Sequence, residues 1–159
     1  MNINASIVDQ RLTGILNDYP DLLPAGLDET KQRSMAFVLL SMATMLDMPL
    51  QDAAELITEG GQDEGVDGLH LGDEEDGEFT VTLFQAKYKH KDLSGEANFP
   101  ENGVQKAIQT VSGLFDPARL LALNDKLRPR VEEIRSLIRD GYIPTVRIVL
   151  CNNGARWSQ

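Results

Sequence analysis

The sequence predicts an α/β sandwich in which a mixed β-sheet is flanked by helices. Two β-rich runs, residues 66–71 and 78–88, are joined by the acidic turn 72–77, which is typical of a β-hairpin. Segments with helical periodicity follow, and a near-continuous apolar run at 146–151 indicates a strand covered on both faces. A hairpin followed by a helical crossover to another strand gives a mixed sheet packed against helices.

Three helices are expected before the hairpin. Apolar residues recur at roughly helical spacing over residues 6–16. Asp28 has the character of an N-cap, so a long helix should occupy residues 29–46. Pro49 suits the first turn of a third helix, whose apolar spacing extends to Ile57.

Further helices are expected between the hairpin and the last strand. An apolar stripe at helical period covers residues 104–115. A helix pair should follow at 118–127 and 130–139, split by Pro129 and closed by Gly141.

Length and composition suggest one domain. The chain has 159 residues and 42% apolar content, which is enough for one sizeable core. We expect a helical extension at 1–28, the α/β domain at 29–152 and a tail at 153–159, cut from a longer protein. The single cysteine, Cys151, excludes an internal disulfide, so a reducing cytoplasm is expected, and no apolar stretch is long enough to cross a membrane.

Charge is unevenly distributed along the chain. The net charge of −10 argues against a general nucleic-acid binder, whose affinity depends on basic residues that neutralise phosphates. Residues 1–80 hold 17 acidic and 3 basic residues, whereas residues 81–159 hold 8 and 12. The acidic half could form a metal-binding edge of the domain beside a basic edge that accepts phosphates. Alternatively, the acidic residues could simply be solvated.

Polar residues end the apolar face of the second predicted strand. Because side chains alternate along a strand, Gln85 and Lys87 share the face of Leu83. Asp67 lies on the preceding strand, where a hairpin of this length could set it opposite them. A carboxylate, an amide oxygen and an ammonium at one strand end suit Mg²⁺, and a buried ion pair of Asp67 with Lys87 is the structural alternative.

Known roles of these groups suggest a reaction. Asp67, the Gln85 side-chain oxygen and the Ala86 backbone carbonyl would hold Mg²⁺ or Mn²⁺. Lys87 would orient or help deprotonate the attacking water and stabilise charge on a phosphate. Phosphodiester hydrolysis is the reaction that such a group of residues suits.

Two short motifs resemble a known family. Residues 60–68, GGQDEGVDG, and residues 83–88, LFQAKY, are similar to the pattern GG-x-D-x-G-h-D…h-h-Q-x-K-Y (h apolar) of Mrr-like restriction endonucleases. They especially resemble the amino-terminal part of the abortive infection phage resistance (AIPR) family. The resemblance implies a restriction endonuclease-like PD-(D/E)xK fold, Mg²⁺-dependent cleavage of nucleic acid and a role in phage defence. The element order extends the similarity to about residue 152.

The sequence departs from the wider superfamily at one ligand. Gln85 replaces the usual acid, a change that Mrr-like members tolerate and that removes one negative charge. Members also commonly supply an acid from the first helix, for which Glu29 is the candidate. Asp63 matches a family position and is either part of the metal shell or an ordinary turn residue.

The expected partner is nucleic acid, with DNA favoured over RNA. Lys89 and Lys91 follow the candidate strand and could contact phosphates, or they belong to a solvated charge run. Gln105 lies near where related nucleases place a polar residue, although glutamines are common on helix surfaces. A homodimer and further domains of a longer chain are other expected partners. The alternative function is a non-catalytic module of the same fold that binds nucleic acid or protein, with Gln85 as the sign of lost chemistry.

Overall fold

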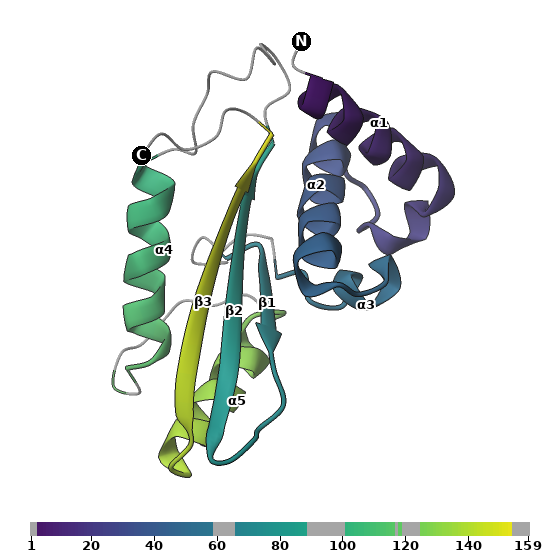
Figure 1. Cartoon of the computed structure of the whole chain (residues 1–159). Coiled ribbons are helices and arrows are strands. Elements are labelled where there is room, and N and C mark those ends of the chain that lie inside the picture. The colour runs from purple at the N-terminus through teal and green to yellow at the C-terminus, as the bar shows by residue number, and fades with distance from the viewer. Residues whose placement is uncertain (1–2, 59–65, 89–100, 117, 119–124, 154–159) are drawn as a thin grey trace. The chain divides into compact units, whose positions relative to one another are not determined.

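The strands that the structure describes form a three-stranded mixed sheet with flanking helices, as predicted (Figure 1). The computed structural model describes residues 3–58, 66–88, 101–116, 118 and 125–153. The elements are α1 (Ile3–Asp18), η1 (Pro20–Leu22), α2 (Glu29–Leu46), α3 (Leu50–Ala54), β1 (Gly68–Leu71), β2 (Glu78–Lys87), α4 (Glu101–Leu114), α5 (Arg128–Arg139) and β3 (Ile143–Asn152). In the described part of the chain, no helix is long and apolar enough to span a bilayer.

The residues group into two compact units. The first comprises residues 1–55, 86–100 and 150–159, and the second comprises residues 56–85 and 101–149. Helices α1, α2 and α3 therefore belong to the first unit, whereas β1, α4, α5 and most of β2 and β3 belong to the second. The expected extension, domain and tail, with limits after residues 28 and 152, stay predictions.

The long helix α2 begins and ends where the sequence predicts. The Asp28 carboxylate accepts a hydrogen bond of 2.8 Å from the backbone N–H of Lys31, which satisfies a donor that the first turn leaves unpaired. The helix ends at Leu46, and the next residue, Asp47, adopts left-handed backbone angles with φ of 50°. Its central residues, Met35–Leu39, are buried.

Helix α3 is shorter than predicted, because strand pairing takes over its expected last turn. The helix ends at Ala54, and Ile57 forms an antiparallel bridge with Gly68 instead. The N–H of Leu69 donates to the Leu56 carbonyl at 3.1 Å. Pairing with β1 thus satisfies backbone groups that the helix would otherwise have used, and the apolar spacing that extended to Ile57 was misleading.

The hairpin β1–β2 is confirmed. The strands pair antiparallel from Gly68 opposite Phe84 to Leu71 opposite Val81. Glu75 and Glu78 exchange two backbone hydrogen bonds of 2.9 Å around Asp76 and Gly77, both of which have positive φ. Positive φ at both central residues is the geometry of a two-residue type I′ turn, for which Asp-Gly is a favoured pair. The Asp76-Gly77 pair therefore fixes where the chain reverses direction between the two strands.

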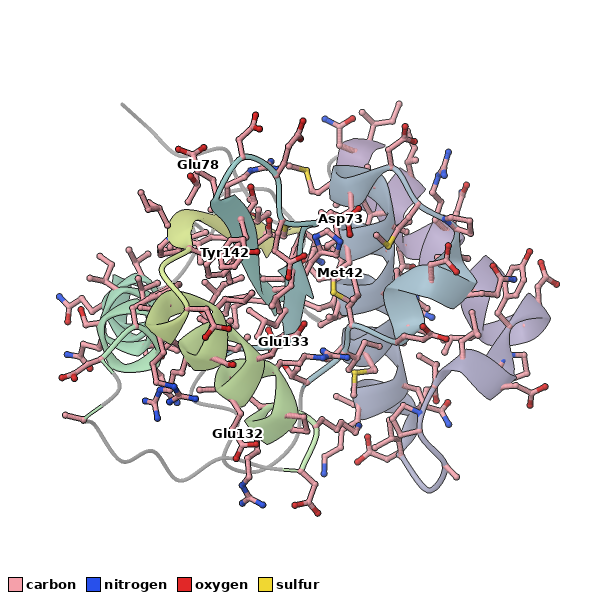
Figure 2. The ribbon with its side chains drawn as sticks, turned by 90° about the horizontal axis from the view of Figure 1, so that it is seen from below. Met42, Asp73, Glu78, Glu132, Glu133 and Tyr142 are labelled. Carbon is pink, nitrogen blue, oxygen red and sulfur yellow. The ribbon has the colours of Figure 1, made fainter. Side chains whose placement is uncertain are left out.

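One face of the hairpin forms the core of the second unit. Leu69, Phe79, Val81 and Leu83 pack in one buried cluster with residues of α4 and α5, and Figure 2 shows both helices on the same side of the strands, with Glu132 pointing away from them. The helical members of the cluster are Leu114, Val131 and Ile134.

A side chain of helix α5 caps the C-terminal end of α4. The Arg135 guanidinium donates to the carbonyls of Gly113 at 2.9 Å and Leu114 at 3.3 Å, near the end of α4. A cation there is favoured by the helix dipole. Pro129 lies in the first turn of α5 rather than between two helices, because its missing N–H is tolerated there. Most of the predicted helix at 118–127 lies outside the described residues.

The last predicted strand is present, but it is less buried than predicted. β3 lies beside β2 and runs in the same direction (Figure 1). It is not fully covered on both faces: Ile143 and Ile148 are 62% and 38% exposed, and no residue of the strand is fully buried. In the described sheet β3 is an edge strand with one neighbouring strand, so its apolar content indicated the strand but not its cover.

Candidate functional site

Asp67 is held on both sides by backbone hydrogen bonds. Its N–H donates to the Phe84 carbonyl at 2.8 Å, and its carbonyl accepts from the N–H of Thr58 at 2.9 Å. Gly68 is also paired with Phe84, so two residues oppose one, which is the arrangement of a β-bulge. The residue is buried, with 7% of its surface exposed. A bulge next to a polar side chain is a common device for directing that side chain into a site.

Asp67 directly precedes β1 and does not lie on that strand as predicted, and residues 56–58 stabilise the segment that carries it. The Thr58 hydroxyl donates to the Val66 carbonyl at 2.8 Å. The Arg130 guanidinium reaches from α5 to the carbonyl of Leu56 at 2.6 Å and is 3.4 Å from that of Leu69. Sequence reasoning missed both Thr58 and Arg130, because their partners are backbone carbonyls that no side-chain motif reveals.

Gln85 continues the apolar face of β2, as predicted. Leu83 packs in the core of the second unit, and Gln85 follows two residues later with only 4% of its surface exposed. Its Oε1 atom is fully buried, and no residue in the described part of the chain donates a hydrogen bond to it. A buried oxygen without a partner destabilises a protein by about 1–3 kcal/mol. Such an atom calls for an additional partner, and a hard cation is one that an amide oxygen can bind.

The structure brings Asp67 and Gln85 to the same end of the hairpin. The carbonyl that accepts the Asp67 N–H belongs to the peptide group joining Phe84 to Gln85. The two residues are therefore neighbours across the strand pair. Together they provide one carboxylate and one amide oxygen that no described residue hydrogen-bonds, which suits a cation such as Mg²⁺ that keeps several water ligands.

Ala86 and Lys87 directly follow Gln85 and complete β2, although they group with the first unit. The Lys87 side chain is exposed, unlike a lysine in an ion pair sealed beneath apolar residues. Its ammonium is thus open to solvent and to a substrate. The Ala86 carbonyl remains a predicted ligand.

Among the residues that it describes, the structure does not bring the other predicted site residues together with Asp67 and Gln85. Glu29 is exposed in the first turn of α2, and Gln105 is exposed on α4, so both roles stay predictions. Asp63, Lys89 and Lys91 lie outside the described residues. Within the described ranges, no three His, Cys, Asp or Glu side chains are grouped to hold a metal.

No protein-family model, curated protein or solved structure matches the chain.

Proposed function

We propose that this chain is a metal-dependent nuclease domain that hydrolyses phosphodiester bonds of DNA. The observation that carries the proposal is the buried Gln85 Oε1, which has no hydrogen-bond partner among the described residues and lies near Asp67, at the strand end that leads to the exposed Lys87. A mixed sheet with flanking helices is compatible with the restriction endonuclease-like PD-(D/E)xK fold that the sequence motifs imply. A member of the AIPR family with this site would act in phage defence or restriction, in the cytoplasm.

Each residue has a distinct role in this proposal. The Asp67 carboxylate, Gln85 Oε1 and the Ala86 carbonyl would hold Mg²⁺ or Mn²⁺, with Asp63 or Glu29 as a further oxygen ligand. When bound, the cation polarises the phosphate and lowers the pKa of water. Lys87 would orient the attacking water, whose proton passes to solvent, and its ammonium would balance the negative charge that grows on the phosphate.

The substrate contacts come from residues around this centre. Lys89, Lys91 and Gln105 are the proposed phosphate contacts, and DNA is proposed ahead of RNA. With a net charge of −10 the chain offers few such contacts, so its affinity for DNA should be weak. A second copy of the chain or a further domain would supply the additional contacts.

Metal-dependent cleavage is the direct test. The protein is incubated at low salt with supercoiled plasmid, single-stranded DNA and RNA, in Mg²⁺, in Mn²⁺ and in EDTA. We expect nicked and linear plasmid with either metal and intact plasmid in EDTA, because the site lacks its cation there. Equal amounts of product with and without metal would contradict the proposal, and faster cleavage of RNA would change the substrate.

A non-catalytic binding module is the second candidate. It is favoured by the amide at position 85 and by the lack of a three-ligand group among the described residues. Such a module would shift DNA in a gel or capture a protein while leaving plasmid intact at every metal concentration. Retarded migration without product thus distinguishes it from the nuclease.

The unpartnered oxygen leads to a prediction for Gln85→Met. Methionine has a similar volume and no buried oxygen to satisfy, so we expect the metal-free protein to gain about 1–3 kcal/mol in unfolding free energy. We also expect it to lose the stabilisation by Mg²⁺, which in the wild type reaches about 2.7 kcal/mol at a hundred times the Kd. Urea unfolding in EDTA and in Mg²⁺ measures both effects.

Gln105→Met is the matched control, because Gln105 is exposed on α4. It should change neither the metal-free stability nor the response to Mg²⁺. A Gln85→Met variant that is less stable than wild type in EDTA would mean that Oε1 already has a partner in the protein.

A further inference from the structure

Tyr88, the residue after Lys87, connects the end of β2 to two helices of the first unit. Its hydroxyl donates a hydrogen bond of 2.6 Å to the Asp9 carboxylate on α1. Its ring lies 5.6 Å from the ring of Phe37 on α2, at an interplanar angle of 49°. Tilted aromatic pairs at this separation are favourable. The polypeptide immediately after the proposed catalytic lysine is thus held by one polar and one aromatic contact.

Arg33 orients the carboxylate that receives the Tyr88 hydroxyl. Its guanidinium forms an ion pair with the Asp9 carboxylate and also donates to the Asp9 backbone carbonyl at 3.0 Å and the Thr13 hydroxyl at 3.3 Å. The hydrogen bond from Tyr88, followed by the interactions with Arg33, holds the pKa of Asp9 below its ordinary value. Burial and the bond to Asp9 raise the pKa of Tyr88. At neutral pH Asp9 is therefore an ionised acceptor and Tyr88 a protonated donor.

We propose that Tyr88 is a positioning residue for Lys87, acting through its hydrogen bond to Asp9. Lys87 is the last residue of β2 and Tyr88 directly follows it, so anchoring Tyr88 restricts the backbone that carries Lys87. Without this contact, the last residue of β2 would be freer to move. The inference rests on the proposed nuclease function, because it assigns Tyr88 a role only through Lys87.

Tyr88→Phe tests the hydrogen bond while keeping the ring against Phe37. We expect kcat for plasmid cleavage to fall about tenfold, the lower end of the range for residues that orient a reactive group, with KM within about twofold of wild type. The melting temperature should stay close to that of wild type, so the loss of rate would not come from unfolding. Tyr19→Phe is the matched control, since Tyr19 is an exposed tyrosine of the same unit, and it should leave kcat unchanged.

Asp9 variants test the other side of the bond. Asp9→Ala should lower kcat to a similar extent, and the double variant with Tyr88→Phe should lose little more than either single variant, because both remove one interaction. Asp9→Asn keeps an acceptor for the hydroxyl and should recover part of the rate. It also serves as the folded variant if Asp9→Ala is unstable.

The outcomes separate this inference from the proposed function. A wild type that cleaves while Tyr88→Phe and Asp9→Ala retain its kcat would overturn the positioning role alone. A rise in KM at constant kcat would also overturn it, because Tyr88 would then act in substrate binding. A wild type without metal-dependent cleavage would overturn both proposals together.

Discussion

Replacing Asp67 by asparagine is expected to lower the rate of metal-dependent DNA cleavage by about 10³-fold, or about 4 kcal/mol of transition-state stabilisation. Asparagine keeps the shape of the side chain and removes its charge, which leaves the proposed cation with neutral oxygens at this end of the hairpin. Single-turnover nicking of supercoiled plasmid measures the loss. Asparagine keeps the size of the buried side chain and the backbone hydrogen bonds of residue 67, and circular dichroism checks that the variant is folded.

Lys87→Met should lower the rate by a similar factor for a different reason. The ammonium is proposed to act on water and phosphate and not on the cation, so this variant should retain stabilisation by Mg²⁺, whereas Asp67→Asn should lose it. Melting temperatures with and without Mg²⁺ distinguish the two roles.

Matched controls come from exposed residues of the same types. Asp73→Asn removes a charge in the hairpin turn, and Lys106→Met removes one on α4. Neither should change the rate by more than about twofold at fixed salt, since single exposed charges have small effects. Cleavage that survives both Asp67→Asn and Lys87→Met would remove these residues from the site.

The features that the sequence predicted depend on local chemistry. Asp28 caps α2 because a carboxylate three residues before Lys31 can reach its N–H, whatever the rest of the fold. Asp76 and Gly77 form the hairpin turn because both accept positive φ. The continuation of the apolar face to Gln85 likewise follows from alternation along one strand.

The features that the sequence did not predict depend on partners far away in the chain. Ile57 leaves the helical pattern because β1 offers backbone hydrogen bonds. The exposure of β3 depends on which elements cover it, which its own apolar residues do not reveal. Tyr88 appeared in the motif without a role, because its partner Asp9 is separated from it by 79 positions. Candidate site residues could thus be named from local patterns, whereas the contacts that hold them could not.

Phe79→Ala should cause the largest loss of stability and leave the chemistry intact. Phe79 is 2% exposed and packs in the core formed by the hairpin with α4 and α5, near the opposite end of β2 from Gln85. Removing a buried phenyl ring typically lowers the unfolding free energy by about 3–5 kcal/mol, through lost burial and the cavity that remains. Urea unfolding followed by circular dichroism measures the change.

Ile108→Ala is the control, because Ile108 is 56% exposed on α4 and its loss should alter stability by less than about 0.5 kcal/mol. The two central variants then have opposite effects. Phe79→Ala lowers the midpoint of unfolding while the cleavage rate per folded molecule stays constant, and Asp67→Asn lowers the rate while the metal-free midpoint stays constant. If Phe79→Ala is folded under the conditions of the cleavage assay but has lost cleavage activity, the two ends of β2 are not independent. The proposed site would then extend beyond Asp67, Gln85 and Lys87.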